Sequence, residues 1–295
     1  MDILERVRGI FRKGEPAEDH IGLEDFEVFG GVETKLHYGY DPNVPDEDGV
    51  LPLAWAIQRK DRDALDALIH AGADVHAEVG DLAESWLHVA AENGFDEGIP
   101  SLIAAGLDPN QWDLVGQTPL NSAITANHTA SLEALVVGGA AMEPKDGNPP
   151  VLHHAVRAGR PESVSKLLEL GADPNARVDS GETPLHSALE TFEHYANGSM
   201  PEAERTAEMD RIAENVSILL EHGADPAAKN NEGLTPLDNA RREAGVRRGA
   251  EQLNTVPLRS DWAPSVSGGE ELRQRMFGGE GAQASHQVHR QRAQF

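Results

Sequence analysis

Apolar residues recur along the middle of the chain as a single residue followed three and four positions later by an apolar pair. This spacing puts all three on one stripe of a helix, so each occurrence predicts an amphipathic helix with one buried side. The five occurrences are Leu65 with Leu68 and Ile69, Ile99 with Leu102 and Ile103, Leu132 with Leu135 and Val136, Val164 with Leu167 and Leu168, and Val216 with Leu219 and Leu220. Short segments of this kind cannot bury their stripe alone and must stack on their neighbours.

Glycines divide the same region into segments of similar length. The six glycines are Gly39, Gly72, Gly106, Gly139, Gly171 and Gly223, with successive steps of 33, 34, 33, 32 and 52 residues. A glycine after a helix can take the left-handed conformation that ends it. A nearly constant period of this length is typical of proteins built from stacked repeats.

A Thr-Pro-Leu signal recurs with the same period. Threonine can cap the start of a helix, and proline in the first turn loses no hydrogen bond. The signal or a variant of it occurs at Leu51–Ala54, Trp86–His88, Thr118–Asn121, Leu152–His153, Thr183–His186 and Thr235–Asp238. Each period is therefore predicted to hold two helices, the first beginning at this signal and the second carrying the apolar stripe.

The combination of these markers resembles the ankyrin repeat. The segment from Gly181 to Ala188 reads Gly-Glu-Thr-Pro-Leu-His-Ser-Ala, nearly the first half of that repeat. The segment from Gly171 to Ala176 reads Gly-Ala-Asp-Pro-Asn-Ala, its second half. The resemblance covers roughly residues 39–245. It implies an all-α fold, an ankyrin-repeat solenoid of about six stacked helix-turn-helix units with short turn fingers.

The expected domain organisation follows from where the repeat signature begins, changes and ends. Residues 1–38 lack it but carry a one-sided apolar stripe, which favours an N-terminal helical cap over a helix lying on a membrane. Residues 39–252 form the repeat domain. The step of 52 places an insertion at about 190–211, where we expect two longer helices projecting from the edge remote from the fingers. Residues 253–295 are expected to form a mostly disordered tail.

Composition narrows the choice of partners. The formal net charge is −25, and so acidic a chain repels phosphate backbones and anionic lipid. We therefore expect binding neither to nucleic acid nor to membranes. The chain has no cysteine, no long apolar run and no secretory signal at its start, which leads us to expect a cytoplasmic protein.

Residues capable of catalysis or metal binding are present, but not in the patterns that such chemistry needs. His88, His153 and His186 occupy the Leu-His position, where the resemblance implies that the histidine ties one turn to the next by hydrogen bonds. The acidic run from Asp41 to Gly49 fails as a calcium loop because Pro45 occupies a ligand position and no closing glutamate follows. We expect no catalytic residues, no metal, no cofactor and hence no enzyme.

The resemblance also implies where a partner would bind, namely on the turn fingers and on the exposed side of each first helix. The positions expected on this face are Glu47, Asp48 and Arg59 in the first repeat, Asp81, Glu84 and Glu92 in the second, Trp112, Leu114, Val115 and Gln117 in the third, Asp146 and Arg157 in the fourth, and Asp179, Glu182 and Glu190 in the fifth.

The third finger differs from the others because it is apolar. Trp112, Leu114 and Val115 lie at or beside one turn tip, where polar residues are usual. Large apolar residues exposed together tend to mark an interface, and tryptophan is a preferred anchor. The alternative is that Trp112 packs back on the neighbouring turn.

These observations favour a non-catalytic protein–protein interaction module, monomeric by preference, whose partner has a basic or amphipathic surface. One specific version is an inhibitor or immunity protein that neutralises a toxin or an enzyme. Another is a scaffold that associates with itself. An enzyme using the inserted helices and the tail is the remaining alternative, but the residues there lack metal-ligand spacing.

Overall fold

The computed structural model describes residues 36, 39–45, 50–143, 149–196 and 201–248. Its contacts divide the chain into a first unit, residues 1–141, and a second unit, residues 142–295. The cap expected over residues 1–38 lies, apart from residue 36, outside the described residues, and so does the tail expected over residues 253–295.

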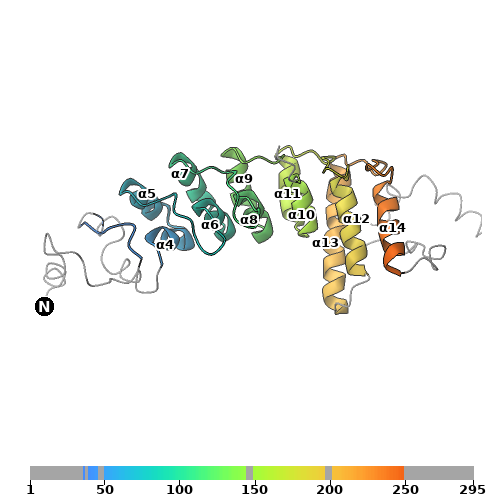
Figure 1. The fold of residues 1–295 in the computed structure, drawn as a ribbon, viewed down its shortest axis with the longest axis horizontal. Coiled ribbons are helices and arrows are strands. Elements are labelled where there is room, and N and C mark those ends of the chain that lie inside the picture. The colour runs from blue at the N-terminus through green and yellow to red at the C-terminus, as the bar shows by residue number, and fades with distance from the viewer. Residues whose placement is uncertain (1–35, 37–38, 46–49, 144–148, 197–200, 249–295) are drawn as a thin grey trace, which may run out of the picture. The chain divides into compact units, whose positions relative to one another are not determined.

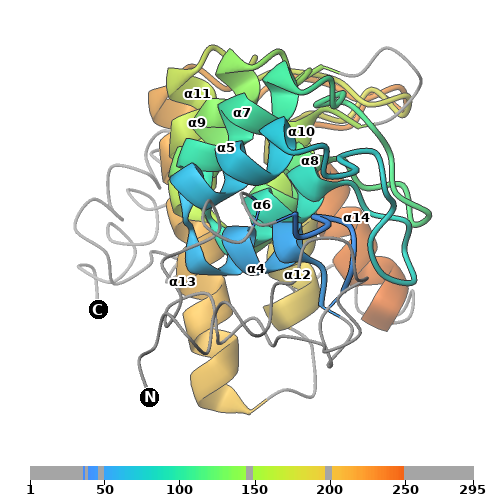
Figure 2. The ribbon, with the colours of Figure 1, turned by 90° about the vertical axis from the view of Figure 1, so that its left-hand side faces the viewer.

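The described part of the first unit holds three helical repeats. They consist of α4 (Pro52–Arg59) with α5 (Arg62–His70), α6 (Trp86–Asn93) with α7 (Ile99–Ala104), and α8 (Pro119–Ala126) with α9 (Thr129–Val137); a 3-10 turn, η1 (Asp96–Gly98), precedes α7. The first helices contact one another in the order α4, α6, α8, and α7 contacts α9. Figure 2 shows these two layers, with α5 and α7 above α4 and α6, and loops projecting to the right.

Sequence signals explain where these helices begin and end. Asp61 caps α5 by accepting a hydrogen bond from the backbone N–H of Ala64 at 3.0 Å. Proline occupies the first turn of α4 and α8. Asn127 ends α8 with a positive φ of 59°, a conformation that asparagine tolerates better than most residues.

The core of the first unit lies between the two layers, where two of the three residues of each predicted stripe are buried. Leu65, Leu68, Ile99 and Leu102 have no exposed surface, and Leu132 and Leu135 of α9 are equally buried. The second repeat, which lacks Thr-Pro, begins instead at Ser85 with Trp86 buried against the core. Burial of these side chains is the main favourable contribution to folding of the repeats.

The second unit continues the same plan. It consists of α10 (Val151–Arg157) with α11 (Pro161–Glu169), α12 (Pro184–Ala196) with α13 (Glu202–Glu221), and α14 (Pro236–Arg248). Helix α12 contacts α10 and α14, while α13 contacts α11, so the layers again follow first and second helices. The stripes at Val164 and Val216 are fully buried. The expected all-helical repeat fold is confirmed within each unit.

Helices α12 and α13 are the long pair in the second unit. They have 13 and 20 residues, against 7 and 9 in α10 and α11. Within this unit, α13 extends well past the ends of α10 and α11 (Figure 1). Buried Asn215 anchors α13 by donating to the carbonyl of Val156 at 3.3 Å. The step of 52 residues from Gly171 to Gly223 therefore corresponds to one longer helical pair, and α12 still contacts both α10 and α14.

Asparagine side chains fasten successive repeats. Asn43 donates through Nδ2 to the carbonyl of Gly72 (3.1 Å) and accepts through Oδ1 from the backbone N–H of Asp74 (2.7 Å). Asn110 and Asn175 make the same pair of bonds to the following repeat. We call this arrangement the asparagine clip; it satisfies two backbone groups at the end of one repeat with a side chain from the repeat before.

Candidate functional site

Buried histidines fix the bases of the fingers. In the first unit, Nδ1 of His88 accepts hydrogen bonds from the backbone N–H (3.1 Å) and hydroxyl (2.9 Å) of Ser85. Its Nε2 donates to the carbonyl of Gln117 in the next repeat at 3.1 Å. The two donors at Nδ1 and the carbonyl at Nε2 select the neutral tautomer with its proton on Nε2. His88 therefore links two neighbouring fingers.

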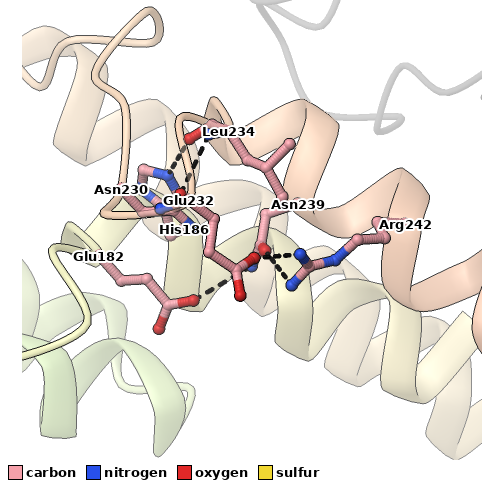
Figure 3. A network of polar contacts seen from close by, with 7 residues as sticks. All are labelled: Glu182, His186, Asn230, Glu232, Leu234, Asn239 and Arg242. Carbon is pink, nitrogen blue, oxygen red and sulfur yellow. Dashed lines mark hydrogen bonds and ion pairs between the residues drawn. The ribbon is translucent and has the colours of Figure 1, made fainter.

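The second unit repeats this arrangement at His186, whose bond to the carbonyl of Leu234 is drawn in Figure 3. Its Nδ1 accepts from Thr183, and its Nε2 donates to the carbonyl of Leu234 at 3.1 Å. His153 accepts at Nδ1 from the hydroxyl of Ser187 and donates at Nε2 to the carbonyl of Ala176, both at 3.0 Å.

Burial lowers the pKa of His88, His153 and His186, because a charged imidazolium would lose its hydration. Hydrogen bonds from Nε2 to backbone carbonyls oppose this effect on the pKa only in part. All three side chains are buried and bonded on both ring nitrogens. Their geometry is that of structural links.

The third finger exposes the apolar side chains that the sequence singles out. Leu114 is 74% exposed, Val115 59% and Trp112 37%, so the tryptophan is the most covered of the three. Leu82, at the tip of the second finger, is 40% exposed. We call these four residues the tip patch. It joins apolar residues of two neighbouring fingers in the first unit.

Backbone hydrogen bonds hold the tip patch together. The N–H of Leu114 donates to the carbonyl of Leu82 at 2.9 Å, which ties one fingertip to the next. The second finger is closed by an antiparallel bridge between Val79 and Glu84. In the third finger, Oδ1 of Asp113 accepts from the backbone N–H of Val115 (3.0 Å) and of Gln117 (2.7 Å). The apolar side chains of the tip patch therefore lie on two turns that are hydrogen-bonded to each other.

Three carboxylates of the second and third repeats interact through their charges. Burial raises the pKa of Glu84, and the negative charges of Glu92 and Asp113 raise that pKa further. Glu84 belongs to the second finger, Glu92 to α6 and Asp113 to the third finger. We call them the acidic group. Asp113 was not among the residues predicted from the sequence, although its place at the start of an Asp-x-x-Gly turn was a usable signal.

The acidic group belongs to a long stretch without any cation. From Asp63 to Pro144 the sequence contains thirteen acidic residues and no Lys or Arg. The acids are Asp63, Asp66, Asp74, Glu78, Asp81, Glu84, Glu92, Asp96, Glu97, Asp108, Asp113, Glu133 and Glu143. More than half of the formal charge of −25 therefore lies in this part of the chain. Sequence reasoning missed it because the charge was totalled over the whole chain.

Three further predicted residues of the first unit are described by the structure. Asp81 is exposed next to Leu82, and the side chain of Gln117 is half-buried. Arg59 lies on α4, where its guanidinium stacks 5.2 Å from the centre of the Trp55 ring. Glu47 and Asp48 lie outside the described residues.

One predicted residue of the second unit, Glu182, lies in a polar network (Figure 3). Glu182 accepts from Nδ2 of Asn239 at 3.3 Å, and Arg242 forms an ion pair with Glu232. The carbonyl of Asp179 accepts from the side chain of Asn231. These contacts occupy several of the polar groups that the fifth and sixth fingers present.

The remaining predictions for the second unit concern three residues. Arg157 is exposed at the end of α10, and Glu190 is half-buried on α12. Asp146 lies outside the described residues.

The described residues also bear on metal binding and on membrane insertion. Among the side chains that the structure places, no three His, Cys, Asp or Glu residues come together in a way that could hold a metal ion. Within the same part of the chain, every helix is too short or too polar to cross a membrane.

Comparison with known proteins connects this architecture to one family of repeats. Residues 87–178 match the model for ankyrin repeats in three copies. The human ankyrin repeat and SOCS box protein 16 is 30% identical over 238 residues, which cover 81% of this chain and 40% of that protein. The zebrafish (Danio rerio) neurogenic locus notch homolog protein 1 is 28% identical over 214 residues, 67% of this chain and 8% of that protein.

A solved structure gives the same result. The ankyrin repeat domain of Bcl-3, described as a member of the IkappaB protein family, is 26% identical with a TM-score of 0.54. The match covers 74% of this chain and 90% of that domain. By contrast, the chain spans less than half the length of the two curated relatives above.

Proposed function

Because the chain belongs to the ankyrin-repeat family, we propose that it is a non-catalytic module that holds a second protein on the finger face of its first unit. Ankyrin repeats are protein–protein interaction modules, and the repeats here are built in the same way. The observation that carries the proposal is the tip patch: Leu82, Trp112, Leu114 and Val115 expose apolar surface on two braced fingers. Apolar surface gathered at a turn tip costs solubility unless a partner covers it.

A non-catalytic role agrees with the state of the histidines. His88, His153 and His186 are buried with both ring nitrogens bonded, so none has a nitrogen left to take a proton from a substrate. General acid–base catalysis needs such a free and reachable group. The three histidines of the repeats thus hold the fingers in place.

The partner is expected to carry a basic or amphipathic surface and to meet this protein in the cytoplasm. The carboxylates around the tip patch attract cations and repel phosphates, which supports a protein partner over nucleic acid or anionic lipid. We expect the remaining finger positions, including Asp179 and Glu182, to add contacts at the periphery. The module itself is expected to be a monomer.

The experiment compares capture and direct binding with surface variants. The tagged protein captures partners from a lysate of its source, each partner is purified, and its affinity is measured by calorimetry. We expect Leu114→Ser with Val115→Ser to weaken binding at least about tenfold, because buried apolar anchors carry most interface energy. Trp112 is left unchanged because its substitution would also disturb the fold.

The matched control is Val137→Ser, which removes an apolar side chain 79% exposed on α9. This change should leave the affinity as it is, because α9 is a second helix. Equal affinities of the wild-type protein and the finger variant for every purified partner would refute the proposed face.

A further inference from the structure

We propose that the tip patch recognises a short peptide segment in which an arginine or lysine lies within two positions of a bulky apolar residue. This inference rests on the proposed function and adds the chemistry of the partner. It follows from how apolar and acidic residues alternate on the two fingers and from the absence of Lys and Arg in the stretch of sequence that carries them.

The first step is the order of residues along each fingertip. The second finger reads Asp81, Leu82, Ala83, Glu84, and the third reads Asp113, Leu114, Val115. Each exposed apolar side chain therefore has a carboxylate one or two positions away. The bond from the N–H of Leu114 to the carbonyl of Leu82 sets the two rows side by side. A peptide side chain that packs on these leucines would therefore place the neighbouring side chains of the peptide opposite carboxylates.

The second step is the electrostatic repulsion among the carboxylates of the acidic group. Glu84 is partly desolvated, and Glu92 and Asp113 repel its charge. A cation brought by a partner would relieve this repulsion, and it would meet a site already shielded in part from water. The protein's own Lys and Arg residues do not come from this stretch, since none occurs between Asp63 and Pro144.

The third step is the kind of peptide that matches both the apolar tip patch and the acidic group. An apolar peptide alone would cover the leucines but leave the acidic group unpaired. A purely basic peptide would be attracted from a distance, but exposed ion pairs contribute little to affinity. Only a segment with both kinds of residue close together joins apolar burial to charge pairing. A peptide with acidic residues at these positions is repelled.

An unbiased selection tests the proposal. A displayed library of random twelve-residue peptides is selected on the immobilised full-length protein at low salt, and the enriched sequences are compared with the unselected library. We expect an excess of Arg or Lys within two positions of Leu, Ile, Phe or Trp. Individual enriched peptides are then synthesised with a fluorophore, and their affinities are measured by anisotropy.

Two double variants divide the site into its parts. Leu82→Ser with Leu114→Ser should weaken the enriched peptides about tenfold or more. Glu84→Gln with Glu92→Gln should weaken them about five- to tenfold and reduce the salt dependence of binding. Matched controls are Val137→Ser for the apolar change and Glu97→Gln with Glu133→Gln for the same change in charge. The controls should keep the affinity within about twofold.

The outcomes separate this inference from the proposed function. In one outcome, the enriched peptides have no excess of Arg or Lys, but their binding still depends on Leu82 and Leu114. This result would overturn the cationic–apolar motif and leave the proposed binding face in place. Enriched peptides that bind both double variants as tightly as the wild-type protein would overturn the motif and the face together. A selection that enriches no sequence would overturn recognition of a short peptide, while capture of whole partners would still test the function.

Discussion

At the scale of single residues, the repeat histidines should make the stability of the fold depend on pH. Each is neutral because its Nδ1 accepts hydrogen bonds and its pKa is lowered by burial. Protonation would place a hydrogen on Nδ1, facing the hydroxyls of Ser85, Ser187 or Thr183. The unfolded chain binds protons first as pH falls below about 6.5, the ordinary pKa of histidine. These histidines therefore stabilise the fold above that pH and lose this contribution below it.

His186→Gln tests this dependence. We expect the variant to be less stable than the wild-type protein at pH 7.5, by about 1–2 kcal/mol, because the bonds to Thr183 and Leu234 are lost or weakened. The gap should narrow as pH is lowered to 5.5, because only the wild-type residue loses stability on protonation. Urea unfolding at several pH values measures the gap. Comparing the two proteins at each pH cancels the gain in stability from neutralising carboxylates, which both proteins share. A stability gap that stays constant with pH would contradict the lowered pKa of His186.

Two neighbouring residues of the third finger should differ in what they contribute to stability. Leu114 is 74% exposed, so Leu114→Ser should change the free energy of unfolding by less than about 0.5 kcal/mol. Trp112 is only 37% exposed, so Trp112→Ser should cost about 1–2 kcal/mol through lost apolar burial. Thermal or urea unfolding of both variants measures the difference. Equal effects would mean that the ring of Trp112 contributes no packing to the finger.

At the scale of the repeat, one position departs from the asparagine clip in an informative way. Glu143 occupies the place, four residues after Gly139, that Asn43, Asn110 and Asn175 hold in their own repeats. An amide both donates and accepts, whereas a carboxylate only accepts. Burial raises the pKa of Glu143, and the charge of Asp173 raises that pKa further. The ionised side chain therefore cannot reproduce the clip.

Glu143→Asn should supply the missing clip. We expect the free energy of unfolding to rise by about 1 kcal/mol at pH 7.5, because two backbone groups gain a partner and a repelled charge is removed. Urea unfolding measures the gain. The reciprocal change Asn175→Glu should cost a similar amount, because it removes a clip with bonds of 3.0 and 2.7 Å. A gain from both substitutions would show that helix or loop propensity, and not the clip, sets the effect.

The helical pairs were predictable from the sequence because their signals are local. Period, capping residues and helix-ending glycines lie within a few positions of the backbone they control, as at Asp61 and Asn127. The 3-10 turn η1 was not predicted because it depends on packing: a Cβ on Gly98 would lie 2.3 Å from the ring of Phe95. By contrast, the second repeat begins at Trp86, as its variant signal predicts, and a histidine three residues after Ser85 completes its cap.

The candidate site was predictable only in part. The apolar third finger could be read directly, since three large side chains stand beside an Asp-x-x-Gly turn. The contribution of Leu82 to the patch and the grouping of Glu84 with Asp113 depend on how two fingers align, which the hydrogen bond from Leu114 to Leu82 fixes. Residues 32 positions apart meet there, and no local pattern specifies such a meeting.

At the scale of the molecule, the clustered acidic charges lower the stability of the fold but favour binding of a cationic partner. Thirteen acids without a cation between Asp63 and Pro144 repel one another in the folded chain more than in an expanded one. The same field attracts a cationic partner from a distance and speeds its association. Salt should weaken both effects, because it screens exposed charges beyond about 10 Å at 0.1 M. A gain in stability and a loss of affinity are therefore expected to come from the same substitutions.

Glu84→Gln with Glu92→Gln tests that coupling. The pKa of Glu84 is raised, so its ionised form is disfavoured by the fold, and above that pKa a neutral glutamine should be better tolerated. We expect the free energy of unfolding at pH 7.5 to rise by about 0.3–0.5 kcal/mol, the size of an exposed like-charge contact. The gain should shrink as pH falls and Glu84 takes up a proton, and it should shrink in high salt. Urea unfolding measures stability, and calorimetry with a captured partner measures affinity. If the variant is no more stable but binds more weakly, the acidic group contributes to binding without destabilising the free protein. If the variant is more stable but its affinity is unchanged, the partner binds elsewhere.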